Sequence, residues 1–65
     1  MEKEQIIKMA ETLNSGGLSI HNYNADDARK ILTEKHPTQN SVAEFDKHAF
    51  DVFLELMKIQ VNYPS

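Results

Sequence analysis

The chain of 65 residues contains no cysteine, which excludes disulfide bonds and thiolate metal sites. It also has only two glycines and two prolines, and it lacks a glycine-rich phosphate loop and a zinc motif. These absences predict a protein that is not an enzyme and binds neither a cofactor nor a metal. A single core of this size supplies only about 3–5 kcal/mol. Oligomerisation is the remaining means of adding stability.

Long apolar runs are absent as well. No stretch approaches the roughly 18 consecutive apolar residues of a membrane span. The first residues, MEKEQIIKMAE, lack the apolar segment of a signal peptide. The formal net charge of −3 is opposite in sign to the basic surface expected of a nucleic-acid-binding protein. We therefore expect a single domain over residues 1–65 that is cytoplasmic, does not associate with membranes and does not favour nucleic acid as a partner.

The most apolar part of the chain is its C-terminal third. All three phenylalanines lie there, and apolar residues recur at spacings of three and four, which predicts a long helix over residues 41–61. Ser41 followed by Glu44 predicts a capping box at its start. The recurring residues are Val42, Phe45, Ala49, Val52, Leu56 and Ile59.

A second apolar set lies beside this stripe and makes the helix apolar around more than half of its circumference. One packed face needs an apolar arc of only about 100°, so two sides of this helix must be covered. We interpret this second set, together with Ala49 of the stripe, as a protein interface. The second set comprises Phe50, Phe53, Leu54, Met57 and Val61. A narrow polar stripe, predicted to face solvent, comprises Glu44, His48, Asp51, Glu55, Lys58 and Asn62.

Two shorter helices are predicted before it. Residues 2–14 have the spacing of an amphipathic helix, and Gly16 and Gly17 follow as its C-terminal cap. Asn24 is a candidate N-cap for a helix over residues 25–36. The segment between these helices predicts an irregular loop that buries Leu18 and Ile20. The predicted fold is therefore all-α, with two short helices packed on one long C-terminal helix.

The order of the second helix, a short turn and the third helix also fits a helix-turn-helix DNA-binding regulator. The first turns of a recognition helix must offer hydrogen-bond donors to base edges. Here those turns carry Glu44 and Asp46, with Lys47 as the one basic residue. DNA binding is therefore the alternative rather than the leading hypothesis.

Other ligand sites have weaker support. The polar stripe contains metal-ligand residue types, but helix-bundle metal sites point into the bundle and this stripe is predicted to point outward. Asn22, Asn24 and Asp26 have the spacing of the first calcium ligands of an EF-hand. Asp27 and Thr33 stand where that loop needs glycine and glutamate. The acidic polar stripe also disfavours an amphipathic membrane-surface helix.

The leading hypothesis is a small regulatory protein that binds other proteins and forms a homodimer through its C-terminal helix. A two-fold interface would bring Phe50, Phe53, Leu54 and Met57 against their own copies. A foreign helix laid on the same surface is the closest alternative. The sequence leaves open the role of the loop over residues 15–24.

Overall fold

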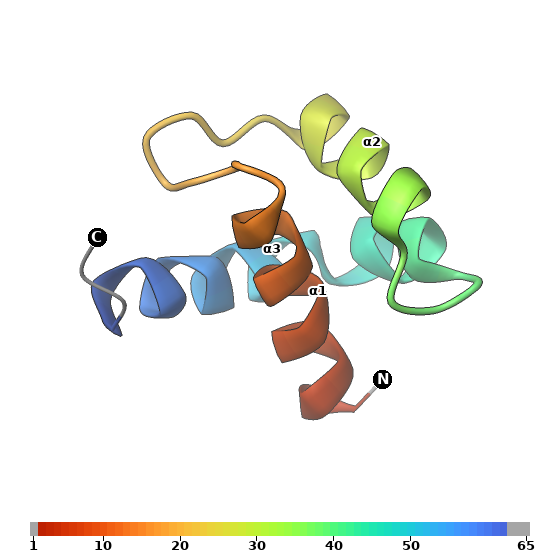
Figure 1. The fold of residues 1–65 in the computed structure, drawn as a ribbon. Helices are drawn as coiled ribbons and strands as arrows, with labels where there is room; N and C mark the ends of the chain where they lie inside the picture. The colour runs from red at the N-terminus through yellow and green to blue at the C-terminus, as the bar shows by residue number, and fades with distance from the viewer. Residues whose placement is uncertain (1, 63–65) are drawn as a thin grey trace.

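A computed structural model describes residues 2–62, and this part of the chain folds into three α-helices with no β-strand. Helix α1 spans Lys3–Ser15, α2 spans Ala25–Lys35 and α3 spans Ser41–Asn62. Helix α1 crosses the C-terminal half of α3 steeply, while α2 lies beside the start of α3 (Figure 1). Because α1 and α2 both pack on α3, the predicted all-α arrangement is confirmed.

The end of α1 forms the cap that its two glycines predict. The N–H of Leu18 donates to the carbonyl of Leu13, and the N–H of Gly17 donates to the carbonyl of Asn14. This pair of bonds is a Schellman motif, which satisfies carbonyls that the last helical turn leaves free. Gly17 has a φ of 95°, which only glycine adopts readily. Leu18 is buried as predicted, whereas Ile20 is only half-buried.

The start of α2 also matches its prediction. The side-chain oxygen of Asn24 accepts hydrogen bonds from the N–H groups of Asp26 at 2.8 Å and Asp27 at 3.2 Å. These bonds satisfy two of the backbone donors that a helix start leaves unpaired.

The predicted capping box at the start of α3 is wrong. The N–H of Glu44 donates to the carbonyl of Asn40, and the N–H of Ser41 donates to the carbonyl of Thr38. The buried hydroxyl of Ser41 instead donates to the carbonyl of Leu32 at 3.3 Å. Leu32 lies in the last turn of α2, where carbonyls lack helical partners, so Ser41 ties the end of α2 to the start of α3.

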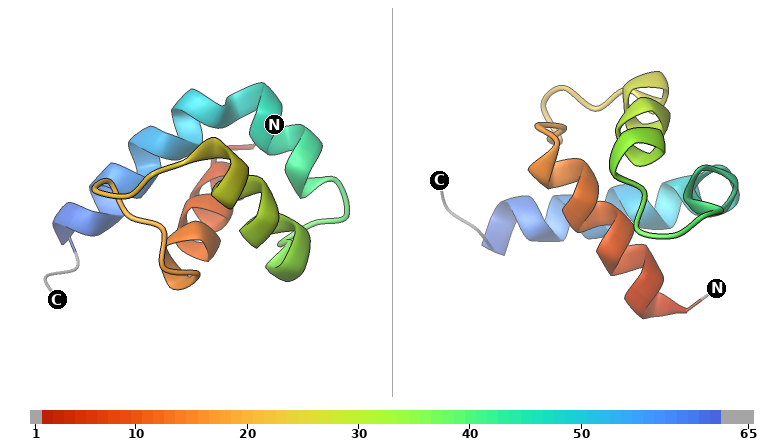
Figure 2. Two further views of the ribbon diagram at one scale, coloured as in Figure 1. Left: turned by 90° about the horizontal axis from the view of Figure 1, so that it is seen from above. Right: turned by 45° about the vertical axis from the view of Figure 1, so that its right-hand side comes forward.

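The core lies where the three helices meet, and α3 bends to reach all of it. His48 has non-helical backbone angles, φ −119° and ψ 25°, and the direction of α3 changes there (Figure 2). Phe45 before the bend and Val52 after it are both buried. The complete buried apolar cluster comprises Met9, Ala10, Leu13, Leu18, Ala28, Leu32, Phe45, Val52, Leu56 and Ile59.

Candidate protein-interaction site

Four large apolar side chains of α3 remain exposed after α1 and α2 have packed on it. Phe50 is 72% exposed and Val61 is 76% exposed, while Leu54 and Met57 are 39% and 37% exposed. We call Phe50, Leu54, Met57 and Val61 the outer row. They follow one another at spacings of four, three and four residues, which brings them into one line along a helix.

The outer row lies on the side of α3 opposite to the core. Each of its members is two positions from a buried residue: Phe50 from Val52, Leu54 from Leu56, and both Met57 and Val61 from Ile59. Two positions correspond to about 200° around an α-helix. Neither α1 nor α2 can therefore cover the outer row while the core stays closed.

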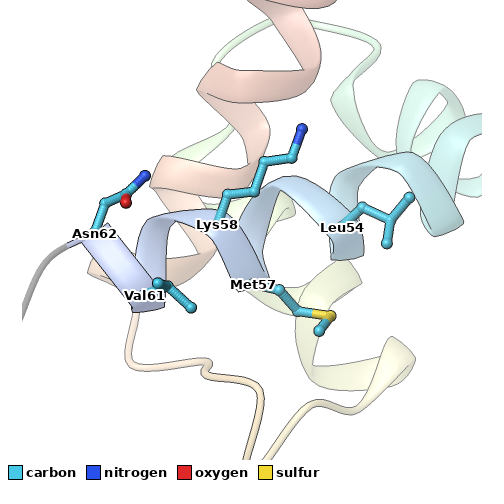
Figure 3. A pocket seen from close by; sticks show the side chains of 5 residues that line it. All are labelled: Leu54, Met57, Lys58, Val61 and Asn62. Atoms are coloured by element: carbon cyan, nitrogen blue, oxygen red, sulfur yellow. The ribbon is translucent and has the colours of Figure 1, made fainter.

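A hollow of about 370 Å³ lies along the C-terminal three members of the outer row. Its lining is mainly Leu54, Met57 and Val61, with Lys58 and Asn62 along one flank (Figure 3). All five residues belong to one helix, so the hollow is an open surface feature without facing walls. Substrate sites are usually clefts with several walls and convergent polar groups, so this surface has the form of a docking surface.

Two residues of the predicted interface have neighbours within the chain. Ala49 is half-buried and packs against the core cluster. Phe53 is also half-buried, and its ring lies 4.7 Å from the ring of Tyr23, centroid to centroid, with the planes inclined by 53°. The structure therefore brings Phe50, Leu54, Met57 and Val61 together on one exposed face and places Ala49 and Phe53 at its edge.

The packing of Tyr23 against Phe53 was missed from the sequence. Tyr23 directly precedes the N-cap Asn24, and this position favours packing onto the following helix, α2, whereas the ring lies against Phe53 of α3. Burial raises the pKa of Tyr23 above its usual value, and the positive charge of Arg29 partly offsets this effect. Tyr23 thus joins the loop to the flank of α3.

The polar stripe of α3 is less exposed than predicted. Of its members, Glu44, His48 and Glu55 are half-buried, with 29%, 22% and 17% of their side chains exposed. The imidazole of His48 lies 3.9 Å from a carboxylate oxygen of Glu44 and 3.6 Å from one of Asp51. Both distances exceed that of a normal hydrogen bond. Within residues 2–62, no group of three or more histidine, aspartate or glutamate side chains could hold a metal ion.

The first half of α3 is joined to α2 by charge. Nε of Arg29 donates to Asp46 at 2.8 Å, and a second guanidinium nitrogen donates to Asp26 at 3.0 Å. The two carboxylates raise the pKa of Arg29 further, the hydrogen bond to Asp46 being the largest cause. The exposed first turns of α3 therefore present Lys47 as their one basic residue, while the guanidinium of Arg29 on α2 is already paired with Asp46 and Asp26.

Comparison with protein-family models, curated proteins and solved structures finds no match for this chain. None of the helices in the described part of the chain combines the length and apolar character that a bilayer crossing requires. The outer row contains all of the large apolar side chains that are exposed in the described part of the chain.

Proposed function

We propose that this protein is a small, non-enzymatic, regulatory interaction protein that acts as a homodimer, and that the outer row of α3 is its dimer interface. The observation that carries the proposal is the exposure of four apolar side chains in one line, opposite to the core. A contiguous apolar patch of this kind usually marks an interaction surface.

The spacing within the outer row favours a helix as the partner. Apolar residues spaced four, three and four apart form the seam by which two helices pack side by side. Fully burying one such side chain contributes about 1.5–3 kcal/mol. Phe50 and Val61, which are mostly exposed in the single chain, have the most to gain from a partner.

A second copy of α3 is a helix that carries apolar residues with this same spacing. A two-fold axis places one patch against its own copy, so each chain would bury the surface that the other exposes. Dimerisation would also stabilise the fold, because a 65-residue chain without disulfides has little stability in reserve. The regulated target would then bind elsewhere on the dimer.

The helix-turn-helix alternative stays a prediction, and no contact near the start of α3 favours it. Glu44 and Asp46 occupy the turns that would face DNA, and Asp46 already accepts a hydrogen bond from Arg29. Phosphate contacts need free basic groups, and Lys47 is the one basic side chain in these turns.

A pair of substitutions tests the proposal without damaging the single chain. The double variant Phe50→Lys/Val61→Lys replaces the two most exposed members of the outer row with a better helix former. The control Glu11→Gln/Glu34→Gln changes exposed residues of α1 and α2 and raises the net charge by the same two units. Far-UV circular dichroism reports folding, and sedimentation velocity reports the oligomeric state.

We expect the wild type and the control to sediment as dimers and Phe50→Lys/Val61→Lys to sediment as a folded monomer. Dimerisation of Phe50→Lys/Val61→Lys would place the interface elsewhere. A wild type that is monomeric at every concentration would leave the outer row for a foreign protein, and homodimerisation would be rejected.

A further inference from the structure

We infer that the two copies of α3 run antiparallel, so that each Asp51 faces the partner's Lys58. This inference rests on the proposed homodimer and adds its orientation. It follows from three features of α3: the sizes of the outer-row side chains, the charges beside them, and the bend at His48.

The sizes of the side chains favour antiparallel packing. With the two-fold axis between Leu54 and Met57, Phe50 lies opposite the partner's Val61, so the largest residue of the outer row meets the smallest. Leu54 then lies opposite the partner's Met57, and the helices keep an even separation. A parallel pair would stack two phenylalanines at one end and two valines at the other, which leaves one end too wide or the other poorly filled.

The charges beside the outer row favour the same orientation. Asp51 and Lys58 lie seven residues apart, on the same flank, and both are more than half exposed. In an antiparallel pair, the flank that carries Asp51 and Lys58 lies against the same flank of the partner, which runs in the opposite direction. Asp51 of each chain therefore lies near the partner's Lys58, and the two-fold axis produces two such pairs. In a parallel pair this flank meets the opposite one, where Phe53 and Gln60 carry no charge. Charges at such flanking positions set the orientation of paired helices.

The contacts that Asp51 and Lys58 make within one chain leave both side chains able to form an ion pair with the partner. Nζ of Lys58 donates to Glu55 at 3.1 Å within the same helix, and an ammonium group has two further donors. Asp51 lies 3.6 Å from His48, beyond normal hydrogen-bond distance. Each residue can therefore gain a contact without losing one.

The bend limits the length of the interface. Because α3 changes direction at His48, its straight portion is residues 49–62, which span about 21 Å at 1.5 Å per residue. A helix segment of this length carries few interface residues besides the outer row, so the buried area is at the low end of the range for specific interfaces. We expect a dimer with a dissociation constant of the order of micromolar.

Disulfide exchange tests the orientation, since the chain has no cysteine of its own. The variants Phe50→Cys and Val61→Cys are each prepared alone and then mixed in equal amounts in a glutathione redox buffer. Positions 50 and 61 are opposite each other in the antiparallel pair. Two copies of either position alone are about 16 Å apart along the axis, too far for a disulfide.

We expect the mixed Phe50→Cys/Val61→Cys disulfide to exceed the two symmetric disulfides by more than tenfold. Symmetric disulfides in equal or greater amounts, or a statistical mixture, would overturn the antiparallel assignment. Sedimentation of the wild type, measured separately, reports whether a dimer exists at all. A monomeric wild type would reject the proposed function, whereas a dimer with symmetric disulfides would reject only the orientation.

Exchange of the two charges provides a second test. Asp51→Lys places two lysines against each other at each end of the antiparallel pair, and we expect it to weaken the dimer about tenfold, which corresponds to about 1.4 kcal/mol. Asp51→Lys/Lys58→Asp restores opposite charges across the interface and should recover most of the affinity. If the double variant is as weak as the single one, Asp51 and Lys58 do not face each other.

Discussion

The ring of Tyr23 lies against the ring of Phe53, with centroids 4.7 Å apart. This contact joins the loop before α2 to the flank of α3 and covers part of that flank. It also separates Phe53 from the outer row. A charged residue at position 53 would disrupt the single chain as well as any dimer, so Phe50 is the better position for testing association.

The Tyr23–Phe53 contact should appear as a coupling energy. Tilted aromatic pairs contribute about 0.5–1.5 kcal/mol beyond the area they bury. We expect a double-mutant cycle of Tyr23→Leu and Phe53→Leu, measured by urea unfolding, to give a value in that range. All four proteins are compared at one protein concentration, because dimerisation links stability to concentration. Additive effects of the two substitutions would show that the rings do not interact in solution.

Tyr23 should also make stability fall at high pH. Burial raises its pKa in the folded chain, so the unfolded chain loses its phenol proton first. The contribution to stability is complete below the unfolded pKa of about 10 and is lost as the pH rises through the folded pKa. We expect the urea midpoint of the wild type to fall more than that of Tyr23→Phe between about pH 9 and about pH 11. Equal losses in the two proteins would contradict the burial of this hydroxyl.

Substitution of Gly17 should lower the free energy of unfolding because of its backbone conformation and not because of crowding. Its φ of 95° is unfavourable for a residue with a Cβ, and a Cβ there would meet no atom within 4 Å. We expect Gly17→Ala to lower the free energy of unfolding by about 1–2 kcal/mol, and Gly17→Asn to cost less because asparagine tolerates this conformation.

Gly16 provides a contrast for the same measurement. Its φ of −80° is ordinary, but a Cβ there would lie 2.7 Å from Cγ2 of Ile31. The loss caused by Gly16→Ala should therefore be relieved by Ile31→Ala, while the loss caused by Gly17→Ala should not. If trimming Ile31 relieves both losses equally, crowding rather than backbone conformation is the cause at Gly17.

The correction at Ser41 leads to a prediction about two residues. Ser41→Ala leaves the carbonyl of Leu32 without the hydroxyl that donates to it, and an unpaired buried polar group costs about 1–3 kcal/mol. Glu44→Ala should cost less, because one carboxylate oxygen of Glu44 is buried without a hydrogen-bond partner in the described chain. A capping box would require both substitutions to be similarly destabilising, as measured by thermal unfolding.

The helices and their order could be predicted because their signals are local. The spacing of Met9 and Leu13 defines the buried face of α1, Asn24 marks the start of α2, and Gly17 marks the turn after α1. Each signal acts within one or two turns of the backbone. The predicted starts of α2 and α3 therefore match the observed ones, and the other helix ends in the described chain differ by one residue each.

Features that depend on packing between elements could not be predicted in the same way. The hydroxyl of Ser41 has a local partner in a capping box, but a carbonyl of α2 competes for it once the helices pack. Neither proline nor glycine marks the bend at His48. The separation of Phe53 from the outer row depends on the path of the loop that carries Tyr23. All four outer-row residues could be included in the predicted interface because their spacing alone sets them opposite the core.

Light scattering on a sizing column, which gives the molar mass of the wild-type chain, decides between a dimer and a monomer. Samples are loaded from about millimolar to about micromolar protein, a range that runs from well above the expected dissociation constant down to about its value. We expect twice the mass of one chain at the highest concentrations, and a fall toward the mass of one chain on dilution. A folded protein with the mass of one chain throughout would rule out the homodimer, and the outer row of α3 would then be a surface for a different protein.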